Sequence, residues 1–457
     1  MASTVKTPSH VVLVGCGELV PKLYLPAIEK GIREGYVASY SIIDFDSQSR
    51  VVRERASRAT VQPEHILFIP NRRDSGIFAD PEDFGPILRH LSEEKGRIRI
   101  IIAAEVKAHE GYLRYCVENN IDSLVEKPVF VPLKDGYFDP ASIEAVMQGL
   151  IATAGENIAR HSVMTLGRYS SIYDDEIFQP IKKRVMEYGA PITSLHLRTS
   201  SGVWNLYREY EEREDHPYKY GYGMLMHGAY HYVDLMAQFL NLNKLIFPDQ
   251  EFELSVSSYG AYPYDQSDRI PKQFSEALED VEPGWSKNSV RDLRFGETDV
   301  TTAFRLIRKK TGKTVTVGTL SLEQTSPSIR NWKELPEGIY NKNGRIPHTD
   351  IEVQLSTIFS MHARTYKLPK RKRIGGDVRL QNMAEISTRT NASMVHAKAY
   401  STNKQFSAYF GNGKEKLLDA WLRGVENRST LDTHMGTMRI IQAIALSLQR
   451  PGYPVTI

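Results

Sequence analysis

Short apolar runs alternate with helical patterns in the first third of the chain. Runs of consecutive apolar residues predict strands, and apolar residues that recur every three or four positions predict helices. The strands are expected at residues 11–14, 41–44, 97–104 and 121–125, and the helices at 47–59, 80–94, 106–119 and 142–154. Apolar strands that alternate with helices are typical of a parallel sheet covered on both faces.

Past Pro128 the pattern changes, and after the helix at 142–154 longer strands follow in which apolar and polar residues alternate. Such alternation predicts an antiparallel sheet with one covered face. The strands are expected at residues 162–166, 192–199, 251–257, 299–306, 314–322 and 351–360. Residues 262–295 are rich in Pro, Asp and Ser and predict insertion loops.

The two patterns predict two domains of different class. Residues 1–156 are expected to form an α/β domain. Residues 157–457 are expected to form an α+β domain with a large, mostly antiparallel, open sheet. A terminal helix is expected over residues 431–449, and it is free to pack back on the first domain.

A glycine turn directly after the first predicted strand carries the first candidate chemistry. Gly15 and Gly17 are followed by apolar residues at helical spacing, although Val20 replaces the third glycine of the usual fingerprint. Glycines let the backbone approach a pyrophosphate, and the helix N-terminus supplies N–H donors. Pro26 is expected to kink or end that helix. The setting predicts a Rossmann dinucleotide-binding domain, with a turn that binds no ligand as the alternative.

The second predicted strand ends in an acid, Asp44. A carboxylate there can accept both hydroxyls of an adenosine ribose and would repel a 2′-phosphate, so Asp44 favours NAD over NADP. Asp46 is near enough to share this role, and Arg50 keeps NADP possible. The alternative for either acid is capping of the following helix.

The strand at residues 121–125 ends in Glu126-Lys127-Pro128. Open α/β sheets bind ligands at the carboxyl ends of their strands. The Lys127 ammonium can donate to a substrate oxygen there, and partial burial would lower its pKa towards neutrality. A surface lysine before a loop proline is the alternative.

His227 and His231 stand four residues apart in a segment predicted as a helix over residues 224–240. Three interpretations compete. The pair could bind zinc, although the glutamate of an H-E-x-x-H motif is replaced by Gly228. Both rings could instead pack against neighbouring side chains or cap a helix. A histidine that titrates near neutrality could also take a proton from an alcohol as a general base.

Composition narrows the class of protein. The chain has 457 residues, 41% hydrophobic and 25% charged, which is ordinary for a soluble globular protein of two or three domains. A net charge of +3 gives no general attraction to nucleic acid or membranes. Cys16 and Cys116 are too few for a disulfide scaffold. Neither the apolar core of a signal peptide nor an apolar run long enough to span a membrane is evident, so a cytoplasmic location is expected.

Three of these features together resemble the glucose–fructose oxidoreductase, inositol dehydrogenase and MocA family. They are the glycine turn with its helix running to Leu25-Pro26-Ala27, the Glu126-Lys127-Pro128 strand end, and the glycine-rich segment that leads to His231 and Asp234. Residues 100–128 are similar to the core segment of the family, including its usual histidine at His109. The likeness covers nearly the whole chain. Residues 17–27 also resemble the related glucose-6-phosphate dehydrogenases.

The resemblance implies roles for individual residues. Lys127 would contact a substrate hydroxyl and help to relay its proton, and His231 would be the general base. The dinucleotide would be held by Gly15, Cys16, Gly17, Glu18, Leu19, Asp44, Ala104, His109, Glu126 and Lys127. Candidate substrate residues are Arg168, Trp204, Tyr230 and His231, and no metal ligand is expected. The large sheet would carry the interface of a homo-oligomer, a dimer or a tetramer.

One residue departs from the pattern of the family. Many members have an aspartate four residues before the base, where this chain has His227, so His227 is a third candidate catalytic residue. The resemblance implies an NAD(P)-dependent oxidoreductase that moves hydride to or from a secondary alcohol or ketone of a sugar, sugar derivative or cyclitol. Two alternatives stay open: a redox-neutral enzyme that cleaves or epimerises glycosides with retained NAD, and a dinucleotide-binding regulatory protein without activity.

Overall fold

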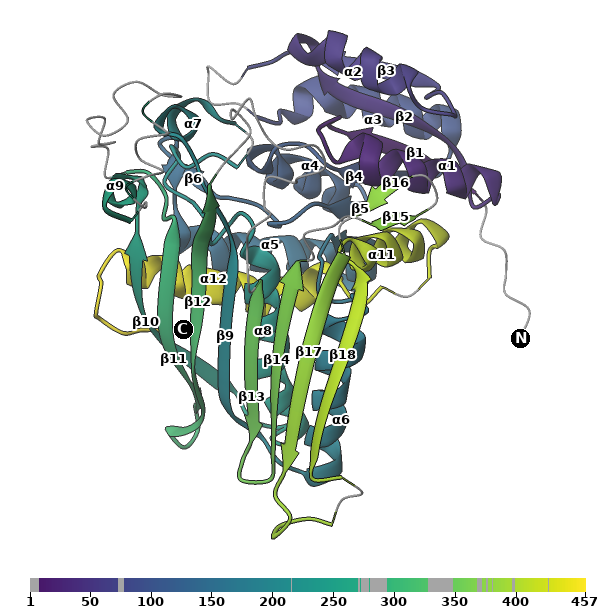
Figure 1. Ribbon diagram of the computed structural model, residues 1–457. Coiled ribbons are helices and arrows are strands. Elements are labelled where there is room, and N and C mark those ends of the chain that lie inside the picture. Colours follow the sequence, from purple (N-terminus) through teal and green to yellow (C-terminus); the bar gives the residue numbers. More distant parts are fainter. Residues whose placement is uncertain are drawn as a thin grey trace. The chain divides into compact units, whose positions relative to one another are not determined.

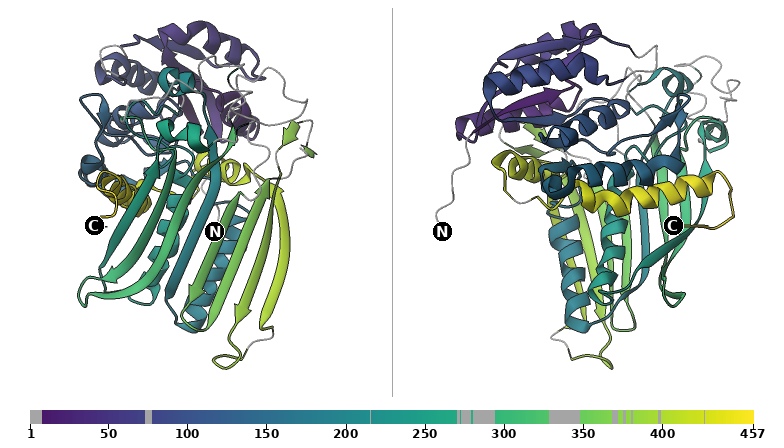
Figure 2. Two further views of the ribbon diagram at one scale, coloured as in Figure 1. Left: turned by 60° about the vertical axis from the view of Figure 1, so that its left-hand side comes forward. Right: turned by 180° about the vertical axis from the view of Figure 1, so that it is seen from behind.

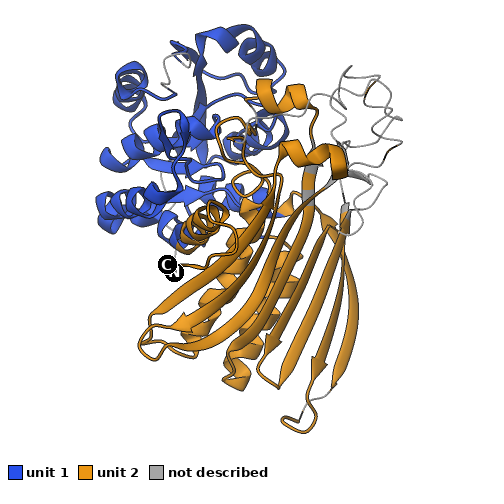
Figure 3. Cartoon of the chain, turned by 90° about the vertical axis from the view of Figure 1, so that its left-hand side faces the viewer, with its two compact units in different colours: residues 1–169, 413–435 blue, residues 170–412, 436–457 orange. Residues whose placement is uncertain are grey.

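The computed structural model describes residues 8–72, 78–214, 216–269, 272, 279, 294–327, 348–367, 372–374, 377–379, 381–396, 399–425 and 427–457. Contacts between residues divide the chain into two compact units (Figure 3). The first comprises residues 1–169 and 413–435, and the second comprises residues 170–412 and 436–457. Among the described helices, none combines the length and the apolar character that crossing a membrane requires.

The first unit is built on a parallel sheet of six strands (Figure 1). Every residue of β1 and β4 is buried, because helices cover both faces of the sheet. The strands lie in the order β3 (His65–Ile69), β2 (Val37–Phe45), β1 (Ser9–Val14), β4 (Ile98–Ile102), β5 (Asp122–Val125) and β8 (His161–Val163). The predicted Rossmann architecture is thereby confirmed.

Five helices of this unit connect successive strands of the sheet: α1 (Leu25–Arg33), α2 (Ser49–Ser57), α3 (Pro81–Lys95), α4 (Val106–Glu118) and α5 (Ile143–Ala154). Helix α3 crosses from β3 to β4 on the other side of β1, and the other four join neighbouring strands. Right-handed crossovers place the first two helices on one face of the sheet and the other three on the opposite face. A small hairpin of β6 (Leu133–Lys134) and β7 (Tyr137–Phe138) follows β5.

The helix after the glycine turn continues through Pro26, so it does not end at this proline as one of the two expectations had it. The chain forms one wide π-helical segment at Val20–Tyr24 before α1 begins at Leu25. Pro26 thus stands in the first turn of α1, where a backbone N–H has no partner within the helix. The missing donor therefore costs the helix no hydrogen bond.

A helix near the C-terminus, α11 (Asn412–Arg423), belongs almost entirely to the first unit, and the sequence patterns did not predict it. Leu417, Leu418 and Trp421 lie in the same hydrophobic cluster as Val11 and Leu13 of β1. At its end, the buried Arg99 of β4 stacks on the Trp421 ring at 4.0 Å and donates to the carbonyl oxygens of Trp421 and Leu422. Apolar packing and a buried guanidinium that donates to two carbonyl oxygens hold α11 in place.

The second unit is built on a mostly antiparallel sheet of nine strands. Among the strand pairs of this sheet that the structure describes, only β9 and β12 are parallel. The order is β18 (Ser401–Tyr409), β17 (Gln381–Thr390), β14 (Phe359–Lys367), β13 (Thr349–Leu355), β9 (Ile192–Trp204), β12 (Lys313–Pro327), β11 (Asp299–Arg308), β10 (Phe252–Ala261) and β19 (Val455–Thr456). The predicted large open sheet is confirmed.

The sheet of the second unit has one covered face, as the alternation of residues predicts. Buried Ile351, Val353 and Leu355 alternate with Glu352 and Gln354 along β13. Three helices lie across the covered face (Figure 2): α6 (Gln179–Tyr188), α8 (Tyr230–Asn241) and α12 (Met435–Leu448). The strands therefore use one set of side chains for the core and leave the other set in solvent.

Two hydrogen bonds join α12 to this core, one to helix α8 and one to strand β10. The Thr437 hydroxyl donates to the buried Asp234 carboxylate of α8 at 2.9 Å, and the Ser258 N–H of β10 donates to the Ser447 hydroxyl at 2.9 Å. α12 begins at Met435, after a short 3₁₀ segment (Leu431–His434), so the predicted terminal helix starts later than expected.

Two other predicted elements have different bounds. The strand expected at residues 351–360 is wrong, because Ser356 adopts a positive φ of 47° and the chain turns there from β13 into β14. Within the expected insertion loops, residues 263–265 form a 3₁₀ turn and α9 (Gln266–Arg269) follows it. Most of residues 270–293 lie outside the described part. Shorter elements complete this unit: a π-helical segment (Tyr173–Phe178), α7 (Tyr207–Glu212), and a hairpin of β15 (Lys372–Ile374) and β16 (Asp377–Arg379).

Replacement of Trp421 by alanine tests the docking of α11. Trp421 is 3% exposed, and its removal is predicted to lower the free energy of unfolding of the first unit by about 3 to 5 kcal/mol. The exposed Lys416 of the same helix provides the control, with an expected change of about 0.5 kcal/mol or less on Lys416→Ala. Urea unfolding measures both. A loss below about 1 kcal/mol for Trp421→Ala would show that α11 is not docked as described.

Candidate functional site

The glycine turn lies at the carboxyl end of β1, where the strand order reverses. β1 pairs with β2 on one side and with β4 on the other, so the connections leave in opposite directions at this point. Gly15 has φ +86°, and a Cβ on it would lie 2.7 Å from the Ala104 backbone. A Cβ on Gly17 would meet nothing within 4 Å. Gly15 thus permits a close backbone packing, while Gly17 faces open space.

Asp44 holds the turn in shape from the end of β2. One of its carboxylate oxygens accepts from the Cys16 N–H at 2.8 Å, and the other accepts from the Phe45 N–H at 2.7 Å. On the outer side, the Arg55 guanidinium of α2 donates to the Cys16 carbonyl oxygen at 2.5 Å and to the Glu18 carboxylate. A carboxylate and a guanidinium therefore clamp the turn from two sides.

The remaining residues of the turn differ in exposure. Cys16 is buried, and burial raises the pKa of its thiol to about 11, so the thiol stays protonated at neutral pH. Glu18 and Leu19 are exposed, and a hydrogen bond from Lys22 holds the pKa of Glu18 below its usual value. The exposed backbone of this turn, the open side of Gly17 and the adjacent acid fit a dinucleotide at the switch point of the sheet.

Lys127 follows β5 and is partly exposed, and the peptide bond to Pro128 is cis. His109 of α4 lies behind this segment: its Nδ1 is 2.8 Å from the Pro128 carbonyl oxygen and its Nε2 is 3.1 Å from that of Ala104. Burial lowers the pKa of His109, although both carbonyls favour the protonated ring. His109 thus links the ends of β4 and β5.

The carboxylate before Lys127 is buried and fully engaged. Glu126 accepts from the Tyr24 hydroxyl at 2.6 Å, from the Lys127 N–H at 3.2 Å, and from the Lys414 ammonium at 3.0 and 3.1 Å. Burial alone would raise the pKa of Glu126, but Lys414, Tyr24 and Lys127 bring it below its usual value. Glu126 is therefore a carboxylate at neutral pH.

Arg168, a candidate for binding an anionic substrate, is buried in the first unit. Its guanidinium donates to the carbonyl oxygens of Arg428 and Thr433 and to the Thr433 hydroxyl. These bonds tie the strand end after β8 to residues 428–433.

In the second unit, His227 lies in an irregular turn rather than in a helix, because α8 begins only at Tyr230. The ring of His227 packs edge-on against Tyr218 at 4.9 Å, Tyr222 at 5.4 Å and His216 at 5.2 Å between centroids. The two histidines therefore do not share one regular helical face.

A buried glutamate holds the turn that carries His227. The Glu297 carboxylate accepts from the Leu225 N–H at 2.8 Å, and its carbonyl oxygen accepts from the Met224 N–H at 2.8 Å. A Cβ on Gly223 would lie 2.0 Å from that same carbonyl oxygen, so only glycine allows the two backbones to pass. Burial raises the pKa of Glu297 to about 7, and the backbone N–H donors counteract this only in part.

The other candidate residues of this unit follow on α8 and β9. His231 is partly exposed on α8, and Tyr230 before it is fully buried. The Tyr232 hydroxyl lies 2.6 Å from Nε2 of the buried His348, so this ring forms part of a polar core. Trp204 is the last residue of β9, and its side chain lies outside the described part.

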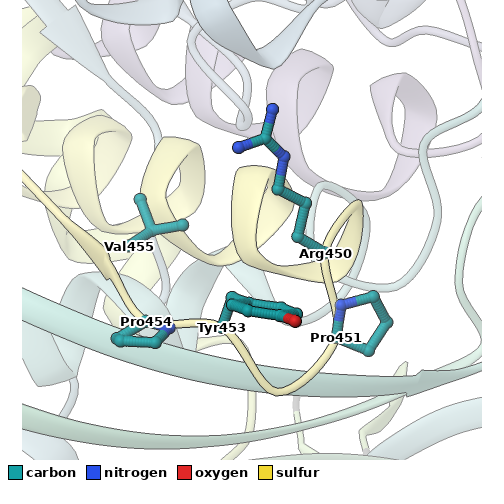
Figure 4. Close-up of a pocket in the computed structure, with 5 residues that line it drawn as sticks. All are labelled: Arg450, Pro451, Tyr453, Pro454 and Val455. Carbon is teal, nitrogen blue, oxygen red and sulfur yellow. The ribbon is translucent and has the colours of Figure 1, made fainter.

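Potential metal ligands also meet on the exposed face of the second sheet. One ligand atom each from Asp350, Glu352 and His362 lies within 4.8 Å of the other two. His362 Nε2 is 2.5 Å from the Asp350 carboxylate, and Arg364 Nε is 3.6 Å from it. The Asp350 carboxylate is thus paired with the His362 imidazole and the Arg364 guanidinium. A separate open hollow of about 500 Å³ is lined by Arg450, Pro451, Tyr453, Pro454 and Val455, none of them a predicted site residue (Figure 4).

Three residues with a role at the candidate site were absent from the sequence prediction: Arg55, Lys414 and Glu297. Arg55 lies in a predicted helix, and its charge gave no sign of reaching back to Cys16. Lys414 lies 288 positions from Glu126, and Glu297 follows the expected insertion loops. Local patterns contain no signal for such distant pairs.

Comparison with known proteins finds similarity in structure alone. No model of a protein family matches the chain, and no curated protein matches it. Among solved structures, levoglucosan dehydrogenase in complex with NADH and levoglucosan has 14% identity and a TM-score of 0.55, with 98% of this chain and 99% of that chain covered. The WlbA dehydrogenase from Bordetella pertussis, in complex with NADH and UDP-GlcNAcA, has 12% identity and a TM-score of 0.54, with 98% and 99% covered.

A third structure extends this likeness. KijD10, a 3-ketoreductase from Actinomadura kijaniata in complex with NADP and TDP-benzene, has 12% identity and a TM-score of 0.52, with 96% of this chain and 98% of that chain covered. The chain has the fold of these oxidoreductases. The fold that follows from the family resemblance is therefore confirmed over nearly the full length.

The titration of Glu297 predicts how stability changes with pH. Its pKa of about 7 in the folded protein lies above the ordinary 4.5, so the folded state binds more protons between these values. The contribution to stability is present below pH 4.5 and is lost as the pH rises through 7. Between pH 5 and 8 the wild type is predicted to lose about 2 to 3 kcal/mol relative to Glu297→Gln, whose amide oxygen still accepts from Leu225.

Urea unfolding at both pH values measures this difference. Glu251→Gln, at an acid with 81% side-chain exposure in the same unit, is the matched control and is expected to follow the wild type. Equal pH dependence in Glu297→Gln and the wild type would mean that Glu297 does not titrate as described.

Proposed function

We propose that the chain is an NAD(P)-dependent oxidoreductase that acts on a secondary alcohol or ketone of a sugar, sugar derivative or cyclitol. One observation carries the proposal. The parallel sheet of the first unit brings the Gly15–Gly17 turn, Asp44 and Lys127 to the carboxyl ends of its strands. A phosphate-binding turn, a ribose acceptor and an amine at one edge of an open α/β sheet suit a dinucleotide and its reaction partner.

The similar structures support the same activity. They are complexes with NADH and levoglucosan, with NADH and UDP-GlcNAcA, and with NADP and TDP-benzene. These are nicotinamide cofactors with sugar-like or nucleotide-linked compounds. The end-to-end match makes the same class of cofactor and substrate the best-supported proposal for this chain. A homo-oligomeric state follows from the family resemblance alone and stays part of the proposal.

The residues that would hold the cofactor follow from the shape of the turn. The turn from Gly15 to Leu19 offers an exposed backbone for a pyrophosphate, Asp44 offers acceptors for ribose hydroxyls, and the chain around Ala104 borders the turn. The nicotinamide would supply hydride chemistry when bound. Glu126 and His109 would act indirectly, by holding the backbone around Lys127, since both side chains are buried.

We assign the proton chemistry to Lys127 and His231. The Lys127 amine would donate to the substrate oxygen that carries the proton, and His231 would accept that proton in one direction and return it in the other. Tyr230, His227 and Trp204 remain candidates for shaping the substrate site, whereas the buried Arg168 guanidinium already donates to Arg428 and Thr433. His227 in its aromatic setting would present a ring where many relatives have a carboxylate.

Cofactor preference is tested at Asp44. Asp44→Asn keeps an acceptor for the Cys16 N–H but removes the negative charge that would repel a 2′-phosphate. The ratio of the NADPH and NADH dissociation constants is predicted to fall about tenfold, equivalent to about 1.4 kcal/mol. Fluorescence titration with both cofactors measures the ratio. An unchanged ratio would remove Asp44 from cofactor selection.

The catalytic role of Lys127 is tested by Lys127→Ala. This variant is predicted to lose turnover by at least about a hundredfold while its affinity for NADH changes little, because the amine acts in proton transfer. Lys134→Ala, at an exposed lysine of β6, is the control and should retain activity. Undiminished turnover in Lys127→Ala would exclude Lys127 from the mechanism.

The same assays separate the alternatives. Release of an aglycone with tightly held NAD and no free NADH would identify the redox-neutral reaction. Binding of NADH without turnover of any sugar or cyclitol would favour a regulatory protein. Absence of binding for both NADH and NADPH would contradict all three.

A further inference from the structure

Glu297 stands just before β11, and the sheet of the second unit holds this point of the chain in register. The Thr298 N–H and hydroxyl both donate to the Ala261 carbonyl oxygen, at 2.8 and 3.0 Å. The Asp299 carboxylate accepts from the Arg269 guanidinium at 2.7 and 2.9 Å. Because these contacts fix the chain that follows Glu297, its backbone is a rigid support for the segment that packs on it.

Two glycines let the segment before α8 pass directly against the segment before β11. A Cβ on Gly223 would lie 2.0 Å from the Glu297 carbonyl oxygen, and a Cβ on Gly296 would lie 2.0 Å from the Tyr222 carbonyl carbon. The Gly296 N–H also donates to the Tyr218 carbonyl oxygen at 2.8 Å. The two segments are therefore in direct backbone contact, and a side chain at either glycine would force them apart.

A series of backbone hydrogen bonds leads from Glu297 to the first turn of α8. The Glu297 carbonyl oxygen accepts from the Met224 N–H at 2.8 Å, and the Met224 carbonyl oxygen accepts from the Ala229 N–H at 3.2 Å. The Ala229 carbonyl oxygen in turn accepts from the Tyr232 N–H at 2.8 Å. His231 stands between these last two residues in the chain, so the position of its backbone depends on where Glu297 holds Met224.

The Glu297 side chain makes a second attachment to the same turn. Its carboxylate is buried and accepts from the N–H of the buried Leu225 at 2.8 Å. Burial raises the pKa of this carboxyl, and among the described groups only backbone N–H donors oppose the rise. Its partner is therefore the turn itself rather than a cation. A buried N–H without an acceptor is costly, so loss of the carboxylate would loosen the turn.

We infer that Glu297 is a positioning residue for His231. Its carbonyl oxygen and carboxylate hold Met224 and Leu225, and the hydrogen bond between Met224 and Ala229 transmits this position to the first turn of α8. A general base must lie within hydrogen-bonding reach of the hydroxyl that it deprotonates, so displacement of the turn lowers the rate of proton transfer. The catalytic part of this inference rests on the proposed function.

Amide hydrogen exchange tests the structural step without a substrate. Glu297→Ala is predicted to speed exchange in residues 222–233 about tenfold, because the Leu225 N–H loses its acceptor. Residues 236–241, at the far end of α8, should exchange as in the wild type. Glu297→Gln keeps an acceptor oxygen and should stay within about threefold of the wild type. Unchanged exchange over residues 222–233 in Glu297→Ala would overturn the inference.

Glu297→Asp provides a second route if Glu297→Ala does not fold. The shorter side chain keeps the charge but draws the carboxylate away from Leu225, so exchange over residues 222–233 should rise as in the alanine variant. Glu297→Gln keeps the length without the charge and should resemble the wild type. The opposite order of these two variants would show that charge rather than reach matters, and the inference would be wrong.

Turnover tests the catalytic step through a double-mutant cycle. Glu297→Ala is predicted to lower kcat about tenfold or more and to change the dissociation constant of NADH by less than about twofold, and Glu297→Gln should keep most of kcat. In a His231→Ala background, Glu297→Ala should cost no further kcat, because its effect acts through the missing base. An equal further loss in that background would overturn the inference.

Asn243→Ala is the matched control. Asn243 is fully buried beyond the other end of α8, and its side chain accepts from the Ile192 N–H at 2.9 Å. Its loss should lower stability, as Glu297→Ala does, but leave kcat and the exchange of residues 222–233 within about twofold of the wild type. An equal loss of kcat in Asn243→Ala would mean that any weakening of α8 suffices, which contradicts a specific role for Glu297.

Failure of this inference and failure of the proposed function give different results. Turnover that depends on His231 but not on Glu297 would overturn the inference alone. Faster exchange in Glu297→Ala, with no turnover of any sugar or cyclitol by the wild type, would remove the proposed function and leave the attachment of α8 to Glu297 in place.

Discussion

The close packing of Gly15 against the backbone of Ala103 and Ala104 is the constraint on which the candidate site depends. A side chain at Gly15 would lie within 2.8 Å of that backbone, so β1 and β4 could not end side by side as they do. The strand order reverses between β1 and β4, so this contact lies at the switch point where open α/β sheets bind ligands. Asp44, Arg55 and the chain after β5 are then arranged around a turn whose shape is already fixed.

Much of this arrangement is readable from the sequence because its signals are local. Consecutive apolar residues at 11–14 and 100–102 identify buried strands, and the glycines at 15 and 17 closely follow the first of them. Glu126-Lys127-Pro128 likewise ends a buried strand. The alternation at 299–306 and 314–322 predicts the second sheet for the same reason, since one face is buried and the other is in solvent.

The sequence is less informative where long-range contacts decide the structure. The run from 351 to 360 hides a turn at Ser356, because the residues on both sides alternate in the same way. The segment from Met224 has helical spacing, but its backbone is held by Glu297, over seventy positions away, and α8 starts only at Tyr230. The ion pair between Lys414 and Glu126 depends on the docking of α11, and no sequence pattern near Glu126 predicts that docking.

The proposed reaction requires the amine of Lys127 and the imidazole of His231 to act on one substrate. The most direct measurement is a crystal structure of the protein with NADH and a bound cyclitol or sugar. The account predicts the pyrophosphate on the turn from Gly15 to Leu19, with both groups within hydrogen-bonding reach of the same substrate hydroxyl. A nicotinamide bound elsewhere, or a substrate that touches neither group, would contradict it.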